Sequence, residues 1–190
     1  MDLNKAIKER HSVRNFTNRK PDWRKIIEAI DLARYAPSAG GIFTTKFILV
    51  DDKEKINRLA DYAQQDFISQ VHYVVIVCSS RKLLGNSFPA QAKEFSKQQT
   101  AAAIQNFLLK LTEQDLATCW IGAFVEENIK DEFKIPEDTD VEAIFPIGYE
   151  TGHVKKKKVI DMDSILYFNK YKNQKMQPVI ANPEKNRYDY

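Results

Sequence analysis

The sequence is poor in the residues that build disulfide frameworks and metal centres. Its 190 residues include only two cysteines, Cys78 and Cys119, and three histidines. Both cysteines lie inside apolar stretches, which favours buried thiols over a disulfide or a redox pair. The histidines His11, His72 and His153 are not spaced with other ligand types as a zinc site requires. We therefore expect no metal centre.

Long apolar runs are also missing. The longest, such as YVVIVC, fall far below the roughly 20 residues that cross a bilayer. The N-terminal MDLNKAIKERHS is polar, unlike a signal peptide. We expect a cytoplasmic protein with no membrane partner. The net charge of +3 is modest, and the run Lys155–Lys158 is typical of a solvated loop, so we expect no nucleic-acid partner.

The common catalytic motifs are absent as well. The chain contains no G-x-S-x-G elbow, no P-loop and no G-x-G-x-x-G fingerprint. No pairing of a nucleophile with a base is evident. If the chain is an enzyme, a cofactor carries the reaction, while the protein supplies anion-binding side chains and backbone donors.

Hydrophobic periodicity predicts alternating helices and strands. We expect helices over residues 2–10, 22–36, 53–65, about 89–115 and 126–136, and strands over residues 46–52, 72–80, 117–122 and 141–149. Asp22 is a good N-cap, and Pro37 and Pro136 each stop a helix. The strand 72–80 is apolar throughout, as expected of a strand covered on both faces. This order predicts layered packing with helices on both faces of one sheet.

Three clusters have the chemistry to bind an anion or a flat ligand. RHSVR (10–14) offers two guanidiniums, which suit phosphate because each can donate two parallel hydrogen bonds. APSAGG (36–41) ends a helix, and its two glycines let the backbone approach a ligand closely. CWIGAF (119–124) places a glycine at a strand end. Each cluster alone also fits an ordinary helix end or loop.

The order of the clusters is more specific. With AAAIQNFLL before LATCWIGAF and AIFPIGYE after it, the chain resembles the FMN-dependent nitroreductase family from about Leu3 to Lys158. The resemblance implies an α+β, three-layer α-β-α fold with a mixed, largely antiparallel sheet flanked by helices. It implies an FMN-binding domain over residues 1–168. The C-terminal extension over residues 169–190 lacks periodicity, and its scattered Tyr171, Met176, Val179, Ile180 and Tyr188 suggest that it docks on a partner subunit.

The function implied by the resemblance is that of a homodimeric oxidoreductase with FMN at the subunit interface. NADH or NADPH would reduce the bound FMN. Hydride would then pass, in a ping-pong cycle, through flavin N5 to a nitroaromatic, a quinone or a similar small-molecule acceptor. No protein side chain need act as the catalytic acid, because the flavin bears the chemistry.

The resemblance also assigns cofactor contacts. Arg10 would contact the ribityl-phosphate and pyrimidine region, with His11 and Ser12 beside it and Arg14 toward the phosphate. The partner subunit would cover the flavin with Pro37, Ser38, Ala39, Gly40 and Gly41. Gln65, or Gln64, would meet the pyrimidine edge. The backbone amides of Gly122 and Ala123, after Ile121, would donate to flavin N5 and O4. One lysine of Lys155–Lys158, with Lys157 and Lys158 as the candidates, would complete the phosphate site.

One stretch departs from the family pattern. Many relatives carry N-x-Q-P-W after the Pro-Ser pair, whereas this chain reads GGIFTTKF, with Gly41 for Asn, Phe43 for Gln and Thr44–Thr45 for Pro-Trp. The acceptor therefore stays open. So do two alternatives: a specialised relative that fragments flavin or removes halogens, with a lid over residues 81–96, and a flavin-binding protein of low turnover.

Overall fold

The computed structural model describes residues 1–152 and 159–176. The chain divides into two compact units, Met1–His153 and Val154–Tyr190. In the second unit, the regular structure within residues 159–176 is a single 3-10 turn, Met162–Ser164. The predicted end of the FMN-binding domain at residue 168 stays a prediction.

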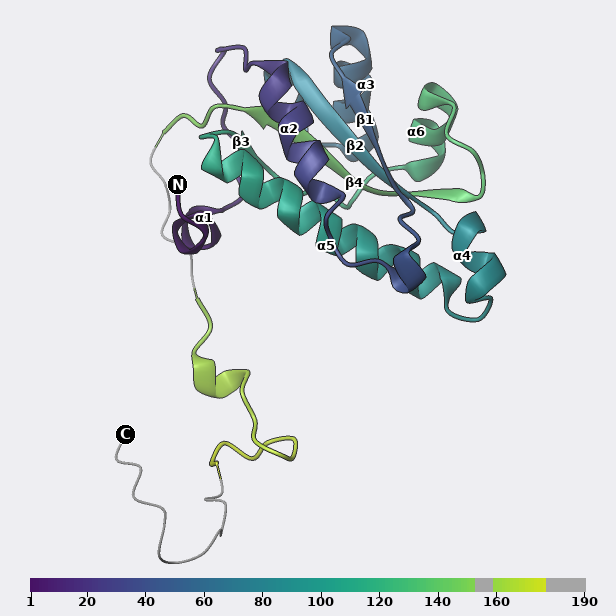
Figure 1. Cartoon of the computed structure of the whole chain (residues 1–190). Coiled ribbons are helices and arrows are strands. Elements are labelled where there is room, and N and C mark those ends of the chain that lie inside the picture. Colours follow the sequence, from purple (N-terminus) through teal and green to yellow (C-terminus); the bar gives the residue numbers. More distant parts are fainter. Residues whose placement is uncertain (153–158, 177–190) are drawn as a thin grey trace, which may run out of the picture. The chain divides into compact units, whose positions relative to one another are not determined.

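The first unit contains helices and strands in a mixed order (Figure 1). The helices are α1 (Leu3–Glu9), α2 (Trp23–Ala33), α3 (Lys53–Ala63), α4 (Lys82–Ser87), α5 (Ala92–Glu113) and α6 (Glu126–Phe133). The strands are β1 (Thr45–Val50), β2 (Tyr73–Ser80), β3 (Ala117–Thr118) and β4 (Thr139–Gly148). All the elements expected from periodicity are present, and α4 is an addition.

The four strands form one sheet in the order β1-β2-β4-β3, and every neighbouring pair is antiparallel. The mixed sheet that we expected is therefore not found among the described residues. The strand β2 is buried from Tyr73 to Ser79, which confirms that both of its faces are covered.

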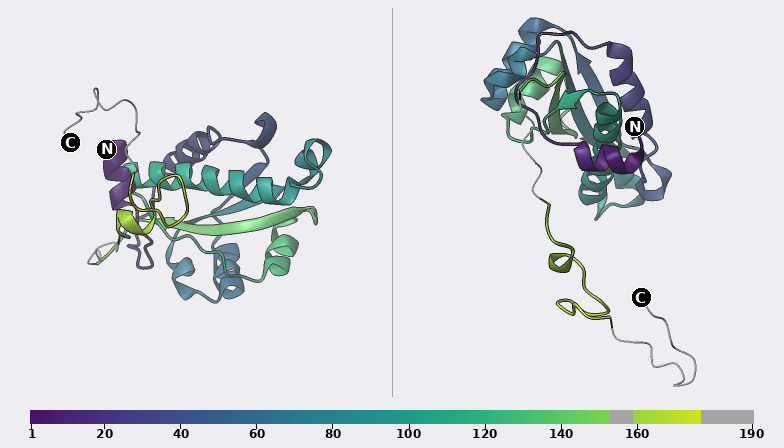
Figure 2. Two further views of the ribbon diagram at one scale, coloured as in Figure 1. Left: turned by 90° about the horizontal axis from the view of Figure 1, so that it is seen from below. Right: turned by 90° about the vertical axis from the view of Figure 1, so that its left-hand side faces the viewer.

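Helices cover both faces of this sheet, as the two views of Figure 2 show. One core lies between the sheet and the helices α2 and α5, and includes Ile26, Phe107 and Phe145. The other core lies on the side of α3 and α6, and includes Ile56 and Ile129. The predicted three-layer arrangement is confirmed.

Helix ends follow local chemistry. The Asp22 carboxylate accepts a hydrogen bond from the Arg24 N–H, which confirms the predicted N-cap of α2. The helix predicted to stop at Pro136 already ends at Phe133, because Lys134 is left-handed with φ of 53°. The long helix α5 begins at Ala92, three residues later than the expected Pro89.

The strand predicted over residues 117–122 is shorter than expected. Only Ala117–Thr118 pairs regularly with β4, and Ile121 rejoins it through a single bridge to Ile144. In this register Cys119 lies opposite Pro146, which has no N–H to donate. The prediction missed this interruption because it depends on the partner strand.

Candidate functional site

The RHSVR cluster lies directly after α1 and is anchored by a buried valine. Val13 is 4% exposed, and its N–H donates to the Thr118 carbonyl at 3.0 Å. Because side chains alternate along an extended segment, Ser12 and Arg14 are exposed, while Arg10 is half-buried. Within residues 1–152 and 159–176 neither arginine forms an ion pair. Both guanidiniums therefore keep their capacity to bind an external anion.

Gln70, which the sequence did not single out, also holds this segment. Its Oε1 atom accepts a hydrogen bond from the Phe16 N–H at 3.1 Å. Phe16 is buried and forms an isolated bridge with Glu150, just after β4. No sequence pattern links residues 54 positions apart, so only the tertiary structure identifies Gln70 as a support of the cluster.

The imidazole of His11 is engaged within the chain at both nitrogens. The Nδ1 atom lies 2.7 Å from the Glu9 carbonyl, and the Nε2 atom lies 3.0 Å from Glu150 Oε2. The Glu9 carbonyl raises the pKa of His11, burial opposes it, and Glu150 adds to the rise. The net result is a pKa above the ordinary 6.5. His11 thus joins the segment after α1 to the end of β4.

The APSAGG cluster forms a tight 3-10 turn over Ala39–Gly41. Gly40 and Gly41 have φ of +58° and +73°, a region that residues with a Cβ rarely adopt. A Cβ on Gly40 would also lie 3.1 Å from Phe88 Cε2. The backbone of the turn therefore favours glycine at both positions, and a Cβ at Gly40 would also require the Phe88 ring to shift slightly.

Gln99 on α5 holds this turn at both ends. Its Oε1 atom accepts a hydrogen bond from the Ala39 N–H at 3.1 Å, and its Nε2 atom donates to the Ile42 carbonyl at 3.1 Å. The Nε2 atom also contacts Thr44 Oγ1. At 4% exposure the Gln99 amide is buried, and hydrogen bonds within the chain use its oxygen and its nitrogen.

Thr44 and Thr45, which stand where many relatives carry Pro-Trp, lie beside the same turn and contact α5. Thr44 and Thr45 are 0% and 3% exposed. The Thr45 hydroxyl lies 2.7 Å from the Thr100 hydroxyl, and the Thr44 hydroxyl lies 3.3 Å from that of Ser96. The two threonine side chains therefore hydrogen-bond to side chains of α5.

Gly122 and Ala123 lie beyond β3, and both are exposed. Neither of their N–H groups donates to another residue of the described ranges. A Cβ on Gly122 would meet nothing within 4 Å, so open space adjoins this backbone. Within the described residues both donors are thus unused, and their contact with a flavin stays a prediction.

The glutamine candidates differ in their surroundings. Gln64 caps α3 in the left-handed region with φ of 51° and is exposed. Gln65 is half-buried, and its N–H donates to the Ala60 carbonyl at 3.0 Å. Both stand before the 3-10 segment Asp66–Gln70, which ends at the glutamine that holds the RHSVR cluster. A cofactor contact of Gln65 stays a prediction.

The first two clusters lie in separate cavities. Arg10 and His11 line one of about 190 Å³. Residues 37–40 line another of about 490 Å³, together with side chains from the α4–α5 region. The two cavities have no lining residue in common. The candidates Lys157 and Lys158 lie outside the described residues.

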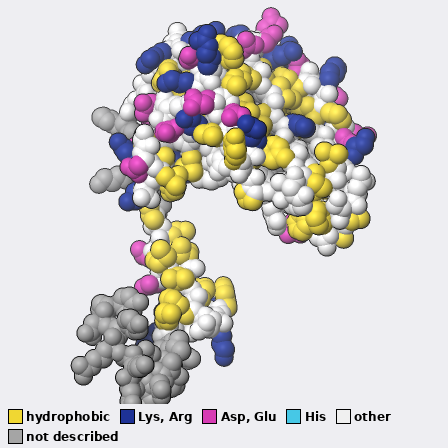
Figure 3. All heavy atoms as spheres, viewed as in Figure 1, with side chains coloured by type: hydrophobic (Ala, Val, Ile, Leu, Met, Phe, Trp, Pro, Cys, Tyr) yellow, Lys and Arg dark blue, Asp and Glu magenta, His cyan; other side chains and the backbone are white. Residues whose placement is uncertain are grey.

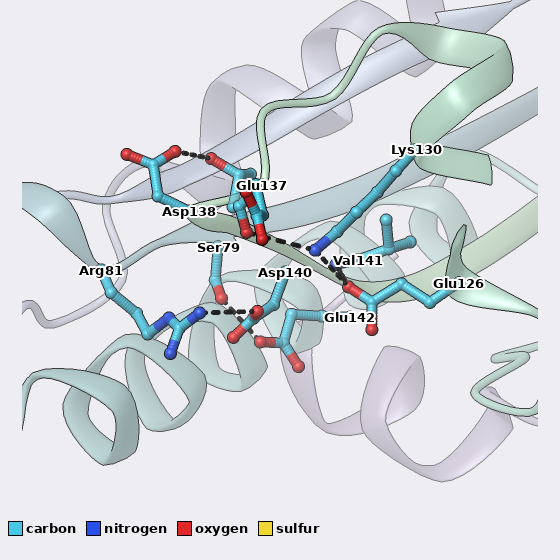
Figure 4. Close-up of polar contacts among 10 residues, drawn as sticks. Ser79, Arg81, Glu126, Lys130, Glu137, Asp138, Asp140, Val141 and Glu142 are labelled. Carbon is cyan, nitrogen blue, oxygen red and sulfur yellow. Dashed lines mark hydrogen bonds and ion pairs between the residues drawn. The ribbon is translucent and has the colours of Figure 1, made fainter. Parts of the chain in front are cut away.

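Another group of polar side chains lies where β2 ends and β4 begins (Figure 4). Two ion pairs lie in this group: Arg81 with Asp140 at 3.3 Å, and Lys130 with Glu126 at 3.1 Å. Ser79 donates to Glu142 at 2.6 Å. No group of three or more possible metal ligands occurs in the part of the chain that is described. None of its helices is long and apolar enough to cross a membrane.

Comparison with known proteins identifies the family. The model of the nitroreductase family matches residues 7–93 and 87–149, which include all three clusters. The chain belongs to the nitroreductase family. A curated relative from Methanothermobacter thermautotrophicus, whose name includes NADH dehydrogenase and NAD(P)H nitroreductase, is 27% identical over 170 residues, 87% of this chain and 86% of that protein.

Solved structures of the nitroreductase family agree. A family member from Clostridium novyi NT is 29% identical, with a TM-score of 0.73 over 91% of this chain and 96% of that one. An FMN-dependent nitroreductase from Clostridium difficile R20291 is 24% identical, with a TM-score of 0.75 over 88% of this chain and 99% of that one. The α+β fold of this nitroreductase-family chain, an antiparallel sheet with flanking helices, is thus shared with solved members.

Proposed function

We propose that this chain is an FMN-dependent oxidoreductase that uses NADH or NADPH to reduce a nitroaromatic, a quinone or a similar small acceptor. Family membership supports this, as do the names of its relatives, one an NAD(P)H nitroreductase and one an FMN-dependent nitroreductase. The observation that carries the proposal is the pair of exposed backbone donors at Gly122 and Ala123, which no other residue of the described ranges uses.

The residues present fit FMN. Arg10 and Arg14 bind its phosphate end with charge-assisted hydrogen bonds, and Ser12 adds an exposed hydroxyl. The Gly122 and Ala123 amides donate to the polar edge of the ring system, and the Gln65 amide contacts its pyrimidine end. When bound, FMN supplies the centre that accepts and donates hydride. The protein's part is to bind, to orient and to stabilise negative charge.

The site belongs to a homodimer in this proposal. One chain keeps Arg10 and residues 37–40 in separate cavities, which supports a site assembled from two copies. The outer edge of β1 has no paired strand within residues 1–152 and 159–176, which leaves it available to a second copy.

The second unit supports the same dimer. Within it, large apolar side chains are 43–81% exposed: Val159, Ile160, Met162, Ile165, Leu166, Tyr171 and Met176. Such a segment is suited to burial against another surface. We propose that the C-terminal extension docks on the partner subunit.

The visible absorption spectrum of the purified protein, supplied with FMN, tests the proposed function. We expect a bound-flavin spectrum that bleaches anaerobically with NADH or NADPH and recovers when a quinone or a nitroaromatic is added. Bound flavin that neither nicotinamide bleaches would contradict the oxidoreductase proposal and favour a flavin-binding protein. Failure to retain FMN would contradict the assigned site.

A further inference from the structure

A third cavity lies on the other face of the sheet from residues 37–40. It is lined by β1, β2, the start of α4 and the segment between the end of α6 and the start of β4, and its volume is about 480 Å³. Small-molecule sites in proteins commonly measure about 300–1,000 Å³. The third cavity has no lining residue in common with those that contain Arg10 or residues 37–40. It is therefore separate from the proposed flavin site.

Part of the lining of the third cavity is apolar. Cys78 and Ile135 are buried, at 1% and 9% exposed, and belong to the core on the side of α3 and α6. Ile48 and Phe133 are half-buried and pack against the same core. A ring or a short hydrocarbon chain that contacts these side chains is removed from water, which favours binding.

Three lysines from three different parts of the fold share this lining: Lys46 on β1, Lys82 at the start of α4 and Lys134 directly after α6. All three are exposed, and none forms an ion pair within residues 1–152 and 159–176. Among the described residues that line the cavity, Asp138 is the one acidic residue, so the net charge of the lining is +2. Figure 3 shows charged and hydrophobic side chains next to one another over the end of the first unit where α6 lies in Figure 1. Cations beside apolar surface suit a ligand that carries an anionic group on an apolar body.

The neighbouring carboxylates do not neutralise the three lysines. Asp140 pairs with Arg81 at 3.3 Å, and Glu126 pairs with Lys130 at 3.1 Å, as Figure 4 shows. In the described part of the chain, Asp138 forms no ion pair with the lysines of the cavity. An external anion would therefore gain the attraction of these positive charges.

Pairing of a second copy with the edge of β1 is compatible with this cavity. Side chains alternate along β1, so Lys46 and Ile48 project from the face toward α3 and α6, while Phe47 and Leu49 pack on the side of α2 and α5. A strand of a second copy that pairs with the outer edge of β1 would bind its main-chain groups. Such a strand would extend the sheet beside the cavity without occupying it.

From these observations we propose that the third cavity is a second ligand site of this chain, which binds a small amphipathic anion: one carboxylate or similar anionic group on an apolar body of one or two rings. Lys46, Lys82 and Lys134 bind the anionic group with charge-assisted hydrogen bonds. Ile48 and Phe133 contact the rings. The proposal does not rest on the proposed function, because no residue assigned to FMN lines this cavity.

Calorimetric titration of the full-length protein tests the proposal. The probe is 2-naphthoate, and naphthalene-2-carboxamide is its neutral counterpart. We expect 2-naphthoate to bind at least tenfold more tightly, and Lys46→Gln and Lys134→Gln each to weaken it about three- to tenfold, because each removes one unit charge. Lys93→Gln, at an exposed position of α5 that lines none of the three cavities, is the matched control and should leave the affinity unchanged. Equal affinity for the two probes, or equal effects of the three substitutions, would overturn the proposal.

Two further measurements locate the bound anion. Titration in the presence of saturating FMN should give the same affinity, whereas loss of 2-naphthoate binding would place the ligand in the flavin site and overturn the proposal. Lysine acetylation, read by mass spectrometry, should be slowed by 2-naphthoate at the three lysines of the cavity and not at Lys93. If those three lysines were unreactive without ligand, another copy would cover the cavity, and the proposal would be wrong. Binding of 2-naphthoate to a protein that retains no FMN would contradict the proposed function alone.

Discussion

The His11 Nε2 atom lies 3.0 Å from Glu150 Oε2 and so connects the segment that carries the RHSVR cluster to the end of β4. Main-chain contacts run beside it: the Thr17 N–H donates to the Tyr149 carbonyl at 2.8 Å, and the Thr151 N–H donates to the Asn15 carbonyl at 3.1 Å. The pair therefore stabilises the junction on which the proposed phosphate site is built.

This pair makes stability depend on pH. The pKa of His11 is raised in the folded protein, so folding favours the protonated imidazole. Its stabilising contribution is fully present below about pH 6.5, the unfolded value, and is lost as the pH rises through the raised folded value. We expect the difference in unfolding midpoint between wild type and His11→Asn to be larger at pH 5.5 than at pH 8.5, as measured by urea denaturation.

Two glutamate variants provide the control. Glu150→Gln removes one cause of the raised pKa of His11, and NMR titration should show that value fall. Glu9→Gln keeps the main-chain carbonyl that contacts the ring, so that hydrogen bond should persist. If His11 titrated identically in wild type and Glu150→Gln, the ion pair would not exist in solution.

Removal of Arg10 should weaken FMN binding. The Arg10→Ala variant loses a charge-assisted contact to the phosphate end, and we expect affinity to fall by about 10- to 100-fold. Fluorescence titration of the apoprotein with FMN measures this. Arg24→Ala removes an exposed guanidinium on α2 and should bind FMN as wild type does. Unchanged affinity in Arg10→Ala would contradict the assigned cofactor site.

Replacement of Gln99 should destabilise the 3-10 turn Ala39–Gly41. Gln99→Leu leaves the Ala39 N–H and the Ile42 carbonyl without their partner, and such a loss costs about 1 to 3 kcal/mol. Urea denaturation should show this loss, and hydrogen exchange of the Ala39 amide should quicken. The exposed Gln105→Leu serves as the control, with little change expected. A Gln99→Leu protein as stable as wild type would mean that the hydrogen bonds to the turn contribute nothing.

The Cys78 thiol should be unreactive. Burial, together with nearby Glu142, raises the pKa of Cys78 to about 12, and its side chain is 1% exposed. We expect mass spectrometry to find Cys78 unmodified after an hour with iodoacetamide at pH 8, and modified once the protein is unfolded in urea. Rapid alkylation of the native protein at this residue would show that β2 opens readily.

The C-terminal extension should contribute to dimerisation. Deletion of residues 172–190, or replacement of the exposed apolar side chains Tyr171 and Met176 by serine, removes surface that we propose to be buried against the partner. Analytical ultracentrifugation over a range of concentrations should show a weaker dimer for both variants. A dimer of unchanged strength in both would argue against docking of the extension.

Periodicity and local chemistry determined most of the elements. The Asp22 cap, the apolar strand around Val75 and the long helix through Phe107 each depend on residues close in sequence, so their patterns are readable directly. The order of the RHSVR, APSAGG and CWIGAF clusters was likewise sufficient for the family, which the comparison confirmed.

Only the tertiary structure decided the contacts between distant segments. The break in the strand after Thr118 depends on Pro146 opposite Cys119, and the support of the RHSVR cluster depends on Gln70. Gln99 on α5 is buried because it hydrogen-bonds to the 3-10 turn Ala39–Gly41. The cavity with an uncharged lining also lies where α5 packs against this turn. Sequence patterns report the periodicity of one segment, whereas hydrogen-bond partners and cavity linings are set by which segments pack together.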